Sequence, residues 1–338
     1  VGDPFIIVVT VNPKPAIADK LDQICSNTSF TLDLASGDAD PTDIIPNNTT
    51  YTWTVNDNPN ITGESNSVGS SSLVTQTLIN DLNSTQIVTY VITPTTSLGC
   101  VGDTFNLTVS VDPKPTITDK VAVICSGESF LVQPTNSPPG NIVPAGTTYT
   151  WTVAANNDVE GELAQTVPQS SISQDLINTS HVDQIVTYTV EPTTVDGCIG
   201  QTFQVDITVE PRPIVTDKFE SICSGDAFDV VPVNTPPGQI VPANTLYTWT
   251  VSTNPFISGS SDQTTPVGGI SQILTSISDV TETIVYTVTP ISGSCIGLDF
   301  DITVSVSPRP FIEDVVLTPI CSEDTFVYVP VTGIPNAS

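Results

Sequence analysis

Tyr149-Thr150-Trp151-Thr152-Val153 is the stretch that decides the fold of this chain. Its large apolar residues alternate with threonine, which is the pattern of a β-strand with one buried face. The stretch recurs as Tyr51-Thr52-Trp53-Thr54-Val55 and as Tyr247-Thr248-Trp249-Thr250-Val251, and successive tryptophans are 98 residues apart both times (151 − 53 and 249 − 151). A constant spacing of this kind predicts tandem structural repeats.

Three further landmarks recur in the same order around this stretch. They are a basic residue between two prolines (Pro13-Lys14-Pro15, Pro113-Lys114-Pro115, Pro211-Arg212-Pro213, Pro308-Arg309-Pro310), an Ile-Cys-Ser turn (ending at Ser26, Ser126, Ser224 and Ser322), and a cysteine two residues before a glycine (Cys100, Cys198, Cys295). These landmarks predict complete repeats at 13–112, 113–210 and 211–307. Residues 1–12 are predicted to be the last strand of a preceding repeat, and residues 308–338 the start of a following one.

Each repeat is predicted to be an immunoglobulin-like β-sandwich. In the second repeat, seven strands fit, at 116–124, 129–133, 147–154, 158–163, 171–177, 184–193 and 201–210. About 98 residues, seven short strands and a tryptophan on the third strand are typical of that fold. Trp53, Trp151 and Trp249 are therefore interpreted as core residues. The linkers are short and contain two prolines, which favours a stiff rod of all-β repeats.

The composition argues against several classes of function. The chain has 36 acidic and 7 basic residues and a net charge of −29, so it repels nucleic acid and anionic membranes. No apolar run is long enough to span a bilayer, so membrane insertion is not expected. The single histidine, His181, has no counterpart in the other repeats. A nucleophile–histidine device needs a histidine in every active unit, so we predict no catalytic residues and no enzyme.

Metal sites are also not expected as a repeated feature. No Cys-x-x-Cys pair occurs, which argues against a zinc site. Asp38, Asp40 and Asp43 cluster in one loop of the first repeat and are a calcium candidate, because calcium prefers carboxylate oxygens. The matching loops of the other repeats, at 136–142 and 234–240, have no acidic residue, so no cofactor common to the repeats is predicted.

The seven cysteines, Cys25, Cys100, Cys125, Cys198, Cys223, Cys295 and Cys321, are predicted to form disulfides. Pairing within a repeat would join Cys25 to Cys100, Cys125 to Cys198 and Cys223 to Cys295. In an immunoglobulin-like sandwich, however, these positions lie at opposite ends, and a disulfide needs Cα atoms within about 7 Å. Pairing across junctions, Cys25 with Cys198 and Cys125 with Cys295, is therefore favoured, and the within-repeat alternative stays open.

The landmarks resemble the PKD-like and Ig-like repeats of giant Bacteroidota surface proteins, such as the SprB-type gliding adhesins. The resemblance rests on an I-C-S-G turn, a Y-T-W strand, a T-Y-T-V strand and a G-C turn before the next P-x-P. It implies an extracellular, cell-surface array that a type IX secretion system exports. Trp151 is followed by Thr152-Val153-Ala154, where PKD domains carry D-F-G-D-G, so the match is to PKD-like repeats only.

Three functions are consistent with these features. The first is a structural stalk of an adhesin that serves gliding motility or surface attachment, with neighbouring repeats as the main partners. The second is a binding module whose variable segments, at 56–72, 154–170 and 252–268, contact glycans, surfaces or a secretion and motility apparatus. The third is a component of self-assembling extracellular filaments.

Overall fold

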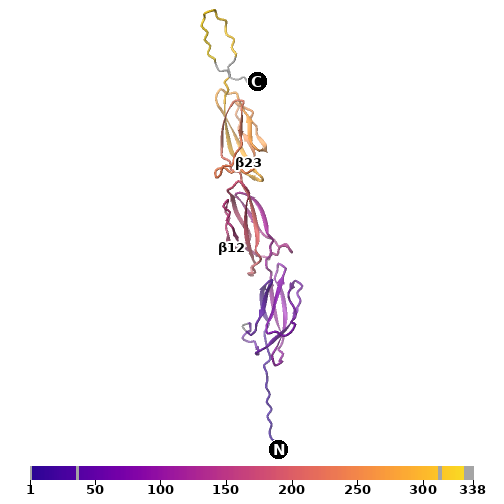
Figure 1. Cartoon of the computed structure of the whole chain (residues 1–338). Helices are drawn as coiled ribbons and strands as arrows, with labels where there is room; N and C mark the ends of the chain where they lie inside the picture. The colour runs from indigo at the N-terminus through magenta and orange to yellow at the C-terminus, as the bar shows by residue number, and fades with distance from the viewer. Residues whose placement is uncertain (1, 36–37, 311–313, 331–338) are drawn as a thin grey trace.

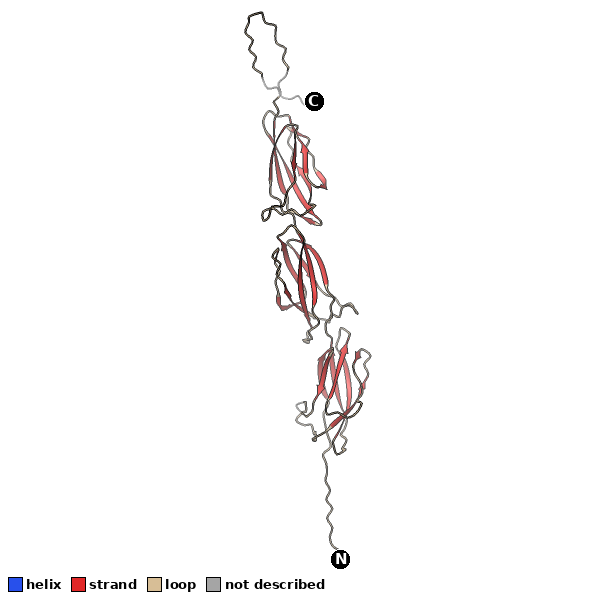
Figure 2. Ribbon diagram, in the orientation of Figure 1, coloured by secondary structure: helices blue, strands red, loops and turns tan. Residues whose placement is uncertain are grey.

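The structure is a computed structural model that describes residues 2–35, 38–310 and 314–330. Three β-sandwiches follow one another in a line along the chain, with the two termini at opposite ends (Figure 1). The described residues contain strands and loops but no helix (Figure 2). Each sandwich has its own hydrophobic core. The predicted rod of all-β immunoglobulin-like repeats is therefore confirmed.

The second repeat shows the arrangement most completely. Its strands are β8 (Lys120–Cys125), β9 (Glu128–Val132), β10 (Thr148–Val153), β11 (Val159–Glu160), β12 (Gln165–Gln169), β13 (Ile172–Asn178), β14 (Gln184–Thr193) and β15 (Phe203–Glu210). The larger sheet has the order β12-β10-β14-β15-β8, and the smaller sheet has the order β11-β13-β9. The first and last strands, β8 and β15, are parallel neighbours, with Glu210 opposite Cys125.

The other two repeats follow the same plan. The first contains β1 (Lys20–Cys25), β2 (Thr28–Leu32), β3 (Thr50–Asn56), β4 (Ile61–Thr62), β5 (Val74–Asn80), β6 (Gln86–Thr95) and β7 (Phe105–Asp112). The third contains β16 (Lys218–Cys223), β17 (Ala227–Val230), β18 (Leu246–Val251), β19 (Ile257–Ser258), β20 (Gln263–Val267), β21 (Ile270–Ile273), β22 (Thr275–Ser276), β23 (Glu282–Ser292), β24 (Cys295–Ile296) and β25 (Phe300–Ser307). The larger sheets have the orders β1-β7-β6-β3 and β16-β25-β23-β18-β20.

Alternating burial explains why the strands form. In β14, Val186, Tyr188 and Val190 are almost fully buried, while the residues between them are not. The hydroxyl of Tyr188 donates a hydrogen bond of 2.8 Å to the side-chain oxygen of Gln174 on the opposite sheet. Tyr90 and Tyr286 make the matching bond in their repeats. A buried hydroxyl needs a hydrogen-bond partner, and here the partner belongs to the opposite sheet. The bond therefore connects the two sheets in each of the three sandwiches.

Two predicted strands differ from the structure. The segment 158–163 forms only the two-residue strand β11, because Gly161 has a φ of +97° and turns the chain, and an additional strand, β12, follows. The first strand begins at Lys120 rather than at residue 116. The carboxylate of Asp119, just before it, accepts the backbone N–H of Gln204 at 2.7 Å, which anchors the beginning of the strand.

The described residues outside the three sandwiches carry no strand. Residues 2–12 are exposed, and residues 314–330 form no strand either. A strand needs a hydrogen-bonding neighbour, so the assignment of 1–12 and 308–338 to flanking repeats stays a prediction. Residues 1, 311–313 and 331–338 of those two segments lie outside the described residues.

Candidate functional site: two bridged junctions between repeats

A disulfide joins each pair of successive repeats. Cys25 of the first repeat is bonded to Cys198 of the second, with Cα atoms 5.6 Å apart. Cys125 of the second is bonded to Cys295 of the third, with Cα atoms 5.5 Å apart. These are the two cross-junction pairs that the sequence favoured, and no within-repeat pair occurs among the described residues. The free cysteines are Cys100, Cys223 and Cys321.

The position of each cysteine follows from the strand order. Cys125 ends β8, beside Glu210 at the end of the parallel strand β15, and the backbone N–H of Ser126 donates to the carbonyl of Glu210 at 2.8 Å. The Ile-Cys-Ser turn that contains Cys125 therefore lies at the end of the repeat where the chain leaves it. Cys198 lies in the turn between β14 and β15, at the other end, where its N–H donates to the Thr194 hydroxyl at 3.0 Å. One cysteine consequently faces each neighbour.

A glycine brings the linker against the cysteine turn. A Cβ atom at Gly200 would lie 2.3 Å from the carbonyl oxygen of Pro115, which is closer than any real contact. Gly102 and Gly297 meet Pro15 and Pro213 in the same way. The glycine two residues after each cysteine is therefore required because the Pro-x-Pro segment packs directly on it.

Ion pairs across the junctions were not predicted from the sequence. Arg212, between the two prolines of the third repeat, contacts Glu128 of the second repeat at 3.1 Å. Arg309 is paired with Asp226 in the same way. The sequence does contain a pattern that could have predicted them, since an acidic residue follows the Ile-Cys-Ser-Gly turn in both cases. The first repeat has Thr28 at this position, so the ion pair is specific to particular junctions.

A carboxylate lies against the second disulfide. An oxygen of Glu210 accepts the hydroxyl of Ser294 at 3.1 Å and is 3.4 Å from the sulfur of Cys295. Cys125, Cys295 and Glu210 are close enough together to resemble a metal site. Both sulfurs are consumed by the disulfide, however, and a metal requires thiolates. The cluster is therefore structural in this state.

Each of the two junctions consequently has two covalent connections, a linker and a disulfide. Cys198 lies at the end of the second repeat that is bonded to the first repeat. From there the chain runs through β15, the linker and β16 to Cys223, so one short segment connects the first junction to the third repeat. Most of this segment is already extended strand. The other strands of the second repeat, β8 to β14, lie outside this path.

The calcium candidate in the first repeat is occupied by a lysine. The ammonium of Lys20 contacts Asp40 at 2.5 Å and Asp43 at 2.8 Å, and the carboxylate of Asp38 accepts the backbone N–H of Asp33. Burial raises the pKa of Asp43, but the hydrogen bonds from Lys20 and from backbone amides outweigh it and lower the pKa overall. Two of the three carboxylates already hold a cation, so these residues do not fit a calcium ion.

The same loop position is neutral in the other repeats. Asn141 and Gln239 correspond to Asp43, and their side-chain oxygens accept backbone N–H groups at 2.9 and 3.4 Å, as the Asp43 carboxylate does at 2.9 Å. All three side chains therefore hold the loop against the beginning of the first strand. Only in the first repeat is the loop side chain itself charged, although in the third the ammonium of Lys218 donates to the Gln239 oxygen at 2.8 Å.

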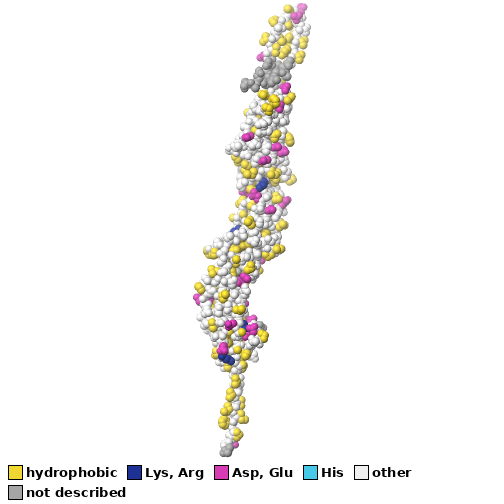
Figure 3. Space-filling view, turned by 180° about the vertical axis from the view of Figure 1, so that it is seen from behind, with side chains coloured by type: hydrophobic (Ala, Val, Ile, Leu, Met, Phe, Trp, Pro, Cys, Tyr) yellow, Lys and Arg dark blue, Asp and Glu magenta, His cyan; other side chains and the backbone are white. Residues whose placement is uncertain are grey.

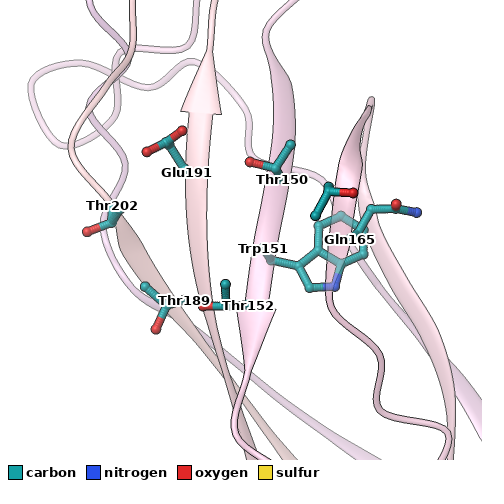
Figure 4. Close-up of a pocket in the computed structure, with 8 residues that line it drawn as sticks. Thr150, Trp151, Thr152, Gln165, Thr189, Glu191 and Thr202 are labelled. Atoms are coloured by element: carbon teal, nitrogen blue, oxygen red, sulfur yellow. The ribbon is translucent and has the colours of Figure 1, made fainter.

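The tryptophans are mostly buried. Trp151 and Trp249 are 4% and 6% exposed and lie in their cores, and Trp53 is partly buried against its core. A shallow hollow beside Trp151 is lined mainly by Thr150, Thr152, Thr189 and Glu191 (Figure 4). The indole N–H donates to the carbonyl of Leu163, and because the side chain is only 4% exposed the ring offers no open face on which a sugar could stack.

His181 lies in the loop before β14 and is exposed. It lines a hollow between the second and third repeats, with Asp183, Glu210 and Pro242. Its side chain has no hydrogen bond to another described residue, so no nucleophile–histidine pair is formed. No helix in the described part of the chain is long and apolar enough to span a bilayer.

Several solved structures are similar to this chain at low sequence identity. Three Ig domains of titin match at 12% identity and a TM-score of 0.35, covering 88% of this chain and 96% of that one. The human desmocollin-1 ectodomain matches at 12% and 0.29, covering 92% and 65%. An endo-fucoidan hydrolase of glycoside hydrolase family 107 matches at 12% and 0.23, covering 88% and 44%. TM-scores this low carry no argument about function.

No curated protein matches the sequence. The PKD-like domain model matches three times, at residues 22–115, 122–213 and 220–310. These matches cover most of the chain, one for each sandwich. The chain therefore belongs to the PKD-like domain family.

Proposed function

We propose that this chain is a section of the stalk of a giant bacterial surface adhesin, which holds a binding tip away from the cell and transmits tension. The observation that supports this most directly is the pair of covalent connections at each junction between repeats. A single linker lets domains rotate and lets an unfolded domain lengthen the chain. A disulfide beside the linker restricts both the rotation of the domains and the lengthening of the chain.

The resemblance to SprB-type repeats extends this proposal to an extracellular, cell-surface location, to export by a type IX secretion system in Bacteroidota, and to gliding motility or surface attachment. PKD-like and Ig-like domains are typical of extracellular proteins. Disulfides also form and persist mainly in oxidising compartments. No enzymatic activity is part of the proposal.

The function is tested by placing the chain between a bead anchor and a binding tip of known affinity. We expect beads with the chain to resist shear as well as beads with the tip alone, and the Cys25→Ser/Cys125→Ser variant to hold the tip on a longer, more extensible tether. A chain that retains beads on glycan surfaces without any tip would instead favour the binding-module function. Equal tether lengths for both forms under load would contradict the stalk.

A further inference from the structure

The first strand of every repeat is an open edge of its larger sheet. β1, β8 and β16 each have one neighbour, the parallel strand β7, β15 or β25, and none on the other side among the described residues. An open edge presents unpaired N–H and C=O groups that another strand can join. The disulfides between repeats involve only the last residues of β1 and β8, Cys25 and Cys125, and not the residues nearer the beginning of these strands.

The opposite edge is protected in the second and third repeats. β12 and β20 contain Pro168 and Pro266, and the pairing of each with its neighbour shifts register at the tryptophan. Proline and bulges are devices that prevent further strand pairing. β1, β8 and β16 contain no proline and no such irregularity. The two edges therefore differ in their capacity to accept a partner.

A large apolar side chain occupies the same position on all three open edges. Leu21, Val121 and Phe219 are the second residues of their strands and are 85%, 83% and 80% exposed. They are the three most exposed large hydrophobic residues within the described strands. Isolated exposed hydrophobic residues are ordinary, but recurrence at one position of an open edge indicates an interaction surface.

Phe219 lies between two side chains of opposite charge, an arrangement that can pair with a second copy of the same strand. Lys218 precedes it and Glu220 follows it. If two copies of β16 pair antiparallel with Phe219 opposite Phe219, then Lys218 of each copy lies opposite Glu220 of the other. Opposite charges facing across a strand pair stabilise it, as do facing apolar residues. A symmetric dimer contact of this kind uses the same patch on both partners.

We infer that the open edge formed by β1, β8 and β16 is a lateral interaction surface whose partner is a second copy of this chain, paired antiparallel, with β16 as the strongest element. Beyond the stalk function, this contact would bundle neighbouring stalks. With β16 opposite β16, β1 and β8 of this chain extend away from the partner, so β16 carries the contact here and further contacts add only in a longer array.

Net charge controls the association. Acidic side chains are spread along the rod and basic ones are few (Figure 3), and the net charge is −29. Two rods therefore repel one another at low salt. Screening acts over about 10 Å at 0.1 M salt and about 3 Å at 1 M. Association is consequently expected to increase with ionic strength, because screening removes more repulsion between the two highly charged rods than attraction at the Lys218–Glu220 contacts.

The test is sedimentation velocity of the chain carrying Cys100→Ser, Cys223→Ser and Cys321→Ser, which prevents disulfide exchange between molecules. The weight-average mass of this chain should rise toward twice the monomer value between about 0.05 and 0.5 M sodium chloride, as the repulsion is screened. Phe219→Lys and Glu220→Lys should each abolish the rise. The charge exchange Lys218→Glu/Glu220→Lys should restore it.

Val167→Lys is the matched control, because Val167 is a 63% exposed residue on the protected edge. This variant should associate like the parent chain, and unchanged melting curves show that every variant is folded. The proposal is overturned if the parent chain stays monomeric at all salt concentrations, if Val167→Lys abolishes association as Phe219→Lys does, or if the charge exchange fails to restore it. None of these results bears on tether length, so the stalk function is tested separately.

Discussion

The Cys25–Cys198 bond should limit how far this chain can be stretched. With the bond intact, the covalent path from Cys25 to Cys223 is the disulfide followed by the segment from Cys198 to Cys223. That segment has about 25 residues (223 − 198), and at about 3.5 Å per residue its limit is about 90 Å. Once both disulfides are reduced, the path has about 198 residues (223 − 25), and its limit is about 690 Å.

The disulfides therefore withhold about 600 Å of chain, nearly all of it in the 173 residues that separate Cys25 from Cys198. Residues 203–210 and 218–223 of the short path are already strands, so more than half of the path is fully extended in the folded state. Complete unfolding of the second and third repeats should then lengthen it by only about 10–20 Å, because strands already rise by about 3.3 Å per residue.

The assay is single-molecule pulling between an N-terminal tag and the thiol of Cys223, which is exposed and free. Cys100→Ser and Cys321→Ser leave Cys223 as the only reactive thiol. Long unfolding steps, together about 600 Å at full extension, should appear only after reduction. The Cys25→Ser/Cys198→Ser variant should show somewhat shorter steps without reduction, because its Cys125–Cys295 bond still shortens the path. Long steps in the oxidised parent chain would refute the covalent path.

Three further predictions concern single sites. Asp43→Asn should reduce the acid sensitivity of the first repeat. The lowered pKa of Asp43 adds stability above about pH 4, and this stability is lost as the pH falls through the lowered pKa, so the melting temperature of the variant should vary less between pH 2 and 7 than that of the parent chain. An unchanged pH profile would contradict the role of Asp43. Gly200→Ala should destabilise the second repeat by roughly 1–3 kcal/mol in denaturant titration, because its Cβ meets the Pro115 carbonyl, whereas Gly140→Ala in the same repeat, whose Cβ meets nothing closer than the Ser137 carbonyl oxygen at 3.9 Å, should change it little. A chelator should leave the melting temperature unchanged, and a fall of several degrees would reveal a structural cation.

Much of the fold could be predicted because it depends on local patterns. The alternation around Trp151 and its recurrence at 98 residues predict strands, repeats and a sandwich without any knowledge of contacts. The small strand β12 could not be predicted in this way. Its existence depends on the turn at Gly161, where a Cβ would lie 2.1 Å from the carbonyl of Asp175, which belongs to the strand after β12.

The cysteines show the same division. Their sequence spacing allowed pairing within or across repeats, and an argument about the two ends of a sandwich was needed to prefer the second. Only the tertiary structure places the Cα atom of Cys25 within 5.6 Å of that of Cys198, across a separation of 173 residues that no local pattern encodes.

The loop of the first repeat shows where composition misleads. Three aspartates close in sequence suggest a calcium site, but two of them, Asp40 and Asp43, are paired with Lys20, which lies in β1. By itself the sequence determined which residues alternate, turn and repeat, because these depend on neighbours along the chain. The tertiary structure decided which charges, cysteines and open edges meet, because that depends on how distant strands are brought together.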